Sequence, residues 1–141
     1  MEVSSVIAII QVVDRVIDLC RFYVETAKEA SSDIRSILLE TSILKTVLEN
    51  VKFLIQQQQN VTTPGLSCLI GPNGVIETCE KTAKDLVALF PVDIVPRSRK
   101  RKRDLATSLA WPLKKAKADK LRTEICHCRA NIVLAITADS A

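Results

Sequence analysis

The chain has 141 residues, 48% of them hydrophobic, and a formal net charge of +4 at pH 7. This length allows one domain with a substantial apolar core. Three glycines, five prolines and long segments rich in Leu, Ile, Val, Ala, Lys and Glu favour an all-α chain.

Five cysteines, at positions 20, 68, 79, 126 and 128, are scattered through apolar stripes. Their odd number and placement favour reduced, buried thiols over a disulfide framework. Glu2 stands where a signal peptide needs positive charge, and no segment reaches the ~20 apolar residues of a membrane-spanning helix. We therefore expect a cytoplasmic protein.

The first helical segment runs from Val3 to Ala27 and has a wide apolar stripe. Such a helix packs at the centre of a bundle or buries its surface elsewhere when released, and central packing is the expectation at rest. The apolar residues among positions 3 to 20 are Val3, Val6, Ile7, Ala8, Ile9, Ile10, Val12, Val13, Val16, Ile17, Leu19 and Cys20.

Four further helical segments follow in chain order. The second spans about 34 to 55, with Ser31, Ser32 and Asp33 as candidate N-caps, and a connecting loop is expected over 60–74. The third ends at Pro91, and 91–97 is expected to be a second connection. A short basic helix over about 98–110 and a helix beginning near Pro112 complete the pattern. The sequence predicts a single all-α domain over 1–141, a bundle of four to five helices.

The charge is distributed unevenly. Residues 97 to 122 carry +9, whereas the rest of the chain carries −5, and "RSRKRKR" is the densest basic run. Three interpretations stay open for this run: a nuclear-import or nucleic-acid signal, a surface for anionic lipid, and a solvated loop without a ligand. Nucleic acid is disfavoured because aromatic residues for base stacking are missing around the run.

The sequence contains few residues or motifs that are typical of a catalytic site. His127 is the single histidine, and consecutive helical residues such as Cys126, His127 and Cys128 point in different directions, so they cannot converge on one metal ion. The "GPNG" segment over 71–74 lacks the Lys and Ser/Thr of a phosphate-binding loop. We expect no enzyme activity, catalytic residue, metal or cofactor.

The C-terminal third carries a resemblance to a known family. An apolar helix at the N-terminus together with "WPLKKAKADKLRTEICHCRANIVLAITADS" resembles the HeLo-like N-terminal domains of fungal NLR-like (STAND, NACHT-associated) proteins. These domains are similar in form to the four-helix bundle of mixed-lineage kinase-like necroptosis proteins. In the fungal NLR-like family a Trp-Pro-Phe-Lys-like motif follows a basic segment, and Leu113 stands in place of its usual Phe. The matching positions are Trp111, Pro112, Leu113, Lys114, Leu121, Ile125, Leu134, Ala135 and Ile136.

The resemblance implies a domain of regulated cell death, heterokaryon incompatibility or innate immunity. A C-terminal sensor domain in a longer protein would oligomerise it, and the clustered, pore-forming bundles would leave the cytoplasm for the plasma membrane. The implied membrane-inserting residues are Val3, Val6, Ile7, Ile10, Val13 and Ile17. The implied contacts to anionic lipid are Arg97, Arg99, Lys100, Arg101, Lys102, Arg103, Lys114, Lys115 and Lys117.

Other interpretations remain. Trp111 and Pro112 are expected to anchor and start the last helix, a structural role. Asp14, Arg15 and Asp18 interrupt the first helix, so an inserted helix would line a pore or lie at the membrane interface. A non-enzymatic adaptor for homotypic or partner-protein binding, and a nuclear protein directed by the basic run, are the alternatives.

Overall fold

The computed structural model describes residues 2–26, 32–57, 64–70, 74–90 and 111–140. They form α1 (Glu2–Thr26), α2 (Ser32–Gln57), α3 (Pro64–Ile70), α4 (Val75–Val87) and α6 (Trp111–Ser140), and strands are absent from these residues. The predicted all-α helical bundle is confirmed.

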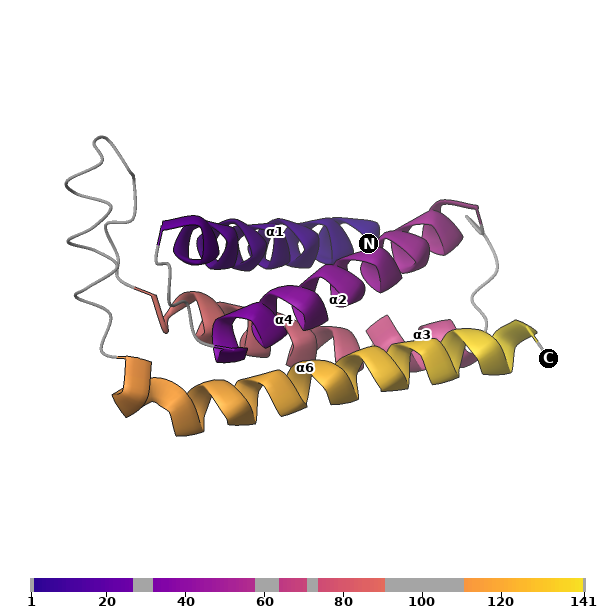
Figure 1. Cartoon of the computed structure of the whole chain (residues 1–141). Coiled ribbons are helices and arrows are strands. Elements are labelled where there is room, and N and C mark those ends of the chain that lie inside the picture. Colours follow the sequence, from indigo (N-terminus) through magenta and orange to yellow (C-terminus); the bar gives the residue numbers. More distant parts are fainter. Residues whose placement is uncertain (1, 27–31, 58–63, 71–73, 91–110, 141) are drawn as a thin grey trace.

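The four long helices pack in a ring. α1 contacts α2 and α4, and α6 contacts the same two helices from the opposite side, as Figure 1 shows. Neighbours alternate in direction where α1 meets α2 and where α4 meets α6, whereas α2 and α6 run in the same direction. The short helix α3 packs on α6 and α4. α1 and α6 are therefore separate walls of the bundle.

Each wall owes its place to its apolar stripe. On α2 the buried residues recur every three or four positions, so they lie on one face of the helix. Thr41 interrupts this face, but its hydroxyl donates to the carbonyl of Ile37 at 2.7 Å, which satisfies a polar group that is otherwise costly to bury. The buried face comprises Ile34, Ile37, Thr41, Leu44, Leu48 and Val51.

The helix boundaries follow the predicted signals closely. α2 begins at Ser32, within the expected capping residues, and Asp33 in its first turn faces the positive end of the helix dipole. α6 begins at Trp111, so Pro112 occupies its first turn, where a missing N–H costs nothing. The expected connection over 91–97 and the expected basic helix over 98–110 lie outside the described residues.

Two expectations need correction. The segment 60–74, expected to be a loop, contains α3, which begins at a proline and is too short for its periodicity to be recognised. α1 does not lie at the centre of the bundle either. Ser4, Ala8, Gln11 and Arg15 are exposed at intervals of three or four residues, so one stripe of the helix faces solvent. α1 is an amphipathic wall.

Gly65 explains how α3 reaches α6. Its backbone N–H donates to Asp139 Oδ1 at 2.8 Å, and a Cβ added at this position would lie 2.5 Å from the carbonyl oxygen of Ala135. Only a residue without a side chain allows this approach of the two helices. This glycine, which lies in the segment expected to be a loop, is a packing contact.

The packing predicts a difference between two leucines of α2. Leu48 is fully buried and Leu39 is 60% exposed. We expect Leu48→Ala to lower the free energy of unfolding by about 2–5 kcal/mol, because it leaves a cavity. Leu39→Ala, the matched control, should change it by less than about 0.5 kcal/mol. Urea unfolding followed by circular dichroism measures both, and equal effects of the two substitutions would contradict this packing.

Candidate functional site

The candidate site is the face of α1 whose residues the resemblance to HeLo-like domains implies to be membrane-inserting. Val6, Ile10, Val13 and Ile17 lie in the hydrophobic core, none more than 7% exposed. Ile7 is half-buried, and the side chain of Val3 lies outside the described part of the chain. The structure thus gathers these candidates on one face, which α2 and α4 cover. That face is not accessible to solvent in this structure.

The same face contains core residues that were not among the candidates. Ile9, Val16, Leu19, Cys20 and Tyr23 are also buried. They belong to the wide stripe seen in the sequence, where spacing alone gave no reason to separate them from Val6 or Ile10. The surface that would have to be re-covered on release therefore extends over most of the helix.

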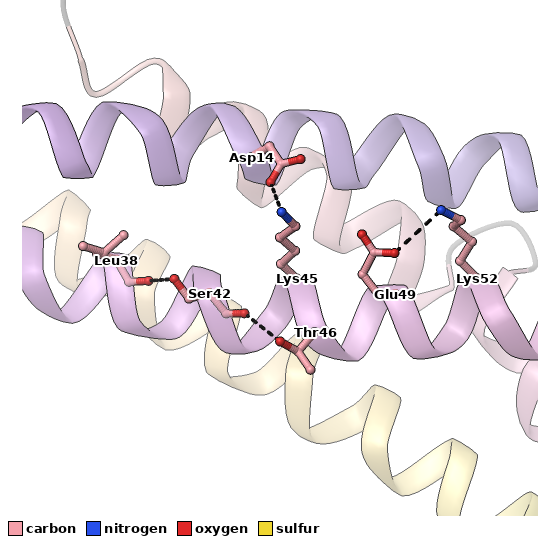
Figure 2. Close-up of polar contacts among 7 residues, drawn as sticks. All are labelled: Asp14, Leu38, Ser42, Lys45, Thr46, Glu49 and Lys52. Atoms are coloured by element: carbon pink, nitrogen blue, oxygen red, sulfur yellow. Dashed lines mark hydrogen bonds and ion pairs between the residues drawn. The ribbon is translucent and has the colours of Figure 1, made fainter.

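An ion pair at the surface joins α1 to α2. Asp14 Oδ1 lies 2.7 Å from Lys45 Nζ, and Figure 2 shows the two side chains directed toward each other. The hydrogen bond and charge of Asp14 raise the pKa of the Lys45 ammonium, and the nearby Arg21 opposes this. Both side chains are about 40% exposed, at 43% and 39%, so water screens the attraction. An exposed pair of this kind contributes little to the stability of the α1–α2 contact.

Along α2, side chains bond to the helix itself. Ser42 Oγ donates to the carbonyl of Leu38 at 2.7 Å, and Thr46 Oγ1 donates to that of Ser42 at 3.3 Å (Figure 2). Lys52 and Glu49 form an ion pair at 3.7 Å within the same helix. Among the α2 residues drawn in Figure 2, Lys45 is the charged one that contacts α1.

The C-terminal part of α1 is anchored by an aromatic contact. Tyr23 is 1% exposed, and its ring centroid lies 5.4 Å from that of Phe90 and 5.6 Å from that of Phe22. Burial raises the pKa of Tyr23 to about 12 and that of Cys20 to about 12, because neither anion is stable away from water. This end of α1 is tied to the residues that follow α4.

The expected lipid contacts are only partly described. Lys115 and Lys117 are exposed near the start of α6. The side chain of Lys114 lies outside the described residues, as do Arg97, Arg99, Lys100, Arg101, Lys102 and Arg103. The side chains of Trp111 and Pro112 are outside them too, so the anchoring role of Trp111 stays a prediction.

The neighbouring residues Cys126, His127 and Cys128 diverge. Cys128 is buried in the core, Cys126 is half-buried and His127 is exposed. Within the described ranges no group of three His, Cys, Asp or Glu side chains is placed to hold a metal ion.

None of the helices in the described part of the chain is sufficiently long and apolar to cross a bilayer.

An apolar groove between α2 and α6 was not anticipated from the sequence. It has a volume of about 270 Å³, and Phe53 and Val133 at its edges are 57% and 45% exposed. The periodicity of α6 contained no signal for it, because which apolar residues stay uncovered depends on how the helices pack. The groove is lined by Val47, Asn50, Phe53, Leu54, Val133, Ile136 and Thr137.

Comparison with known proteins gives no match: no family model, no curated protein and no solved structure is significantly similar to this chain. The resemblance to HeLo-like domains stays a prediction from the sequence.

Burial of Cys20 and Tyr23 predicts alkaline destabilisation. Because both folded pKa values are raised, stability is fully present below the unfolded values of 9.0 and 10.0 and is lost as the pH rises toward 12. Between its unfolded and its folded pKa, each group lowers the free energy of unfolding by about 1.4 kcal/mol per pH unit.

Tyr23 is the only tyrosine, so tyrosinate absorbance reports it directly. We expect a titration midpoint near 12 in the folded chain and near 10 in denaturant. Tyr23→Phe should reduce the loss of stability above pH 10, whereas Cys68→Ser, at an exposed thiol, should not. A tyrosinate midpoint near 10 in a chain that is still folded would contradict the buried site.

Proposed function

We propose that the bundle is a membrane-permeabilising effector domain of the HeLo-like kind, activated when copies cluster. The observation that supports this most is the position of α1, a helix with a continuous apolar face that forms one wall of the ring. Detaching it disturbs the contacts with α2 and α4. Those between α6 and the same two helices need not break.

Burial at a membrane can replace most of the burial that α1 has in the bundle. Releasing α1 exposes residues such as Val13 and Ile17, each of which loses roughly 1.5–3 kcal/mol of burial. A bilayer interface covers the same apolar face and returns much of this free energy. The exposed Asp14–Lys45 pair adds little to the barrier, because both ions are already partly hydrated.

Clustering supplies the remaining drive. A single bundle offers few contacts to a membrane, but linked copies bind together at a high effective concentration. Lys115 and Lys117 face solvent and attract anionic headgroups, each by about 1 kcal/mol at an acidic surface. The polar stripe of α1, with Arg15 and Asp18, then faces water, so the helix lies in the interface or lines a pore.

A reversible cross-link tests whether α1 must leave. In a Cys68→Ser/Cys126→Ser background, Asp14→Cys and Lys45→Cys place two thiols where the ion pair joins α1 to α2. A bis-maleimide with a cleavable disulfide linker ties the helices together. We expect clustered, cross-linked protein to lose at least tenfold in dye release from phosphatidylserine vesicles, and reductant to restore it.

The control places the same linker within one helix. Glu49→Cys and Lys52→Cys replace an ion pair of α2 and leave α1 free, so this cross-linked protein should keep its leakage activity. If cross-linking at positions 14 and 45 leaves dye release unchanged, α1 does not need to detach and the proposal fails.

A second candidate function is an adaptor that binds another protein through the groove between α2 and α6. The exposed Phe53 and Val133 favour it, because apolar side chains that remain at the surface around a groove are typical of binding sites. Phe53→Ser distinguishes the two candidates. An adaptor would lose its clustering-dependent effect in cells, whereas a membrane effector acting through α1 would keep both toxicity and vesicle leakage.

A further inference from the structure

The contact between α4 and α6 brings together side chains far apart in the sequence. The two helices run in opposite directions (Figure 1), and Thr82 Oγ1 of α4 donates to Glu124 Oε2 of α6 at 3.3 Å. One turn back on α4 is Cys79, and one turn forward on α6 is Cys128. In an antiparallel pair these steps lead the same way along the interface, so the two cysteines face each other.

The surroundings of this pair are apolar. Cys79 is fully buried and Cys128 is 4% exposed, and both belong to the hydrophobic core of the described residues. The interaction with the Cys128 side chain, together with burial, raises the pKa of the Cys79 thiol, and the same interaction lowers the pKa of Cys128. This mutual influence agrees with two thiols that are neighbours across the interface. The pair is thus asymmetric, with Cys128 the better thiolate.

We propose that Cys79 and Cys128 form a reversible disulfide that links α4 to α6 when the chain meets a peroxide. The inference does not depend on the proposed membrane function, since the proposed link joins α4 to α6 and does not include α1. It turns two of the thiols expected to be merely buried into a modification site.

The chemistry balances with hydrogen peroxide as oxidant. The Cys128 thiolate attacks one peroxide oxygen, the O–O bond breaks, and hydroxide leaves and takes up a proton to give water. Cys79 then attacks the sulfur of the resulting sulfenic acid, and a second water leaves as the S–S bond forms. Two thiols are oxidised by two electrons, and one peroxide becomes two waters.

The link would join the two helices that flank residues 91–110. It would close one loop containing that whole basic segment, and a closed loop lowers the entropy of the unfolded chain. The oxidised chain should therefore melt at a higher temperature than the reduced one, and dithiothreitol should reverse the shift.

Peptide mapping requires a background with fewer cysteines. Trypsin leaves Cys68 and Cys79 in one peptide, 53–81, and Cys126 and Cys128 in another, 123–129. The full chain with Cys68→Ser and Cys126→Ser keeps three cysteines, at 20, 79 and 128. A link between these two peptides then identifies the pair without ambiguity.

The folded variant is treated with hydrogen peroxide, unfolded in the presence of a maleimide, and digested. We expect free thiols to fall from three to one, peptides 53–81 and 123–129 to be joined, and the melting temperature to rise reversibly. Adding Cys128→Ala should abolish both the link and the shift. The proposal is overturned if all three thiols are recovered, if Cys128 is over-oxidised without a link, or if the link involves Cys20.

Discussion

The structure depends on the burial of one wide apolar face, that of α1, against α2 and α4. The face is broad because apolar residues stand at neighbouring positions as well as at intervals of three and four. As a result, Val6, Ile9 and Val13 all lose their contact with water. Each buried side chain of this size contributes roughly 1.5–3 kcal/mol, more than an exposed ion pair provides. Among the described helices, α1 contributes the most buried apolar side chains, so its removal would expose the most apolar residues.

The polar contacts are arranged around this constraint. Thr41, a polar side chain in the core, is satisfied locally by the carbonyl of Ile37. The charged contact between α1 and α2, Asp14 with Lys45, lies at the surface where water replaces it readily. α1 is therefore held by contacts that an apolar interface reproduces, whereas the contact between α4 and α6 contains the thiol pair and the Thr82–Glu124 hydrogen bond. Release of α1 is therefore compatible with a cross-link between α4 and α6 in the same bundle.

Periodicity was sufficient to predict the four long helices, because each buries one stripe and the stripe is written in the spacing of Leu, Ile and Val. It failed at α3, which lies in the segment expected to be a loop and whose Gly65 permits close contact with α6. It also placed α1 at the centre, since counting apolar residues did not give weight to the exposed stripe through Gln11 and Arg15. The pairs Asp14–Lys45 and Cys79–Cys128 were beyond reach, because each requires the register between two helices.

Hydrogen exchange of α1 tests the central claim most directly. Exchange is measured by mass spectrometry on clustered protein, in solution and on anionic vesicles that are leaking. Protection in solution should extend across α1, α2, α4 and α6. On leaking vesicles, we predict that exchange within α1 changes throughout its length while α2 and α6 keep their protection. Leakage with α1 exchanging as it does in solution would show that the bundle acts without releasing this helix.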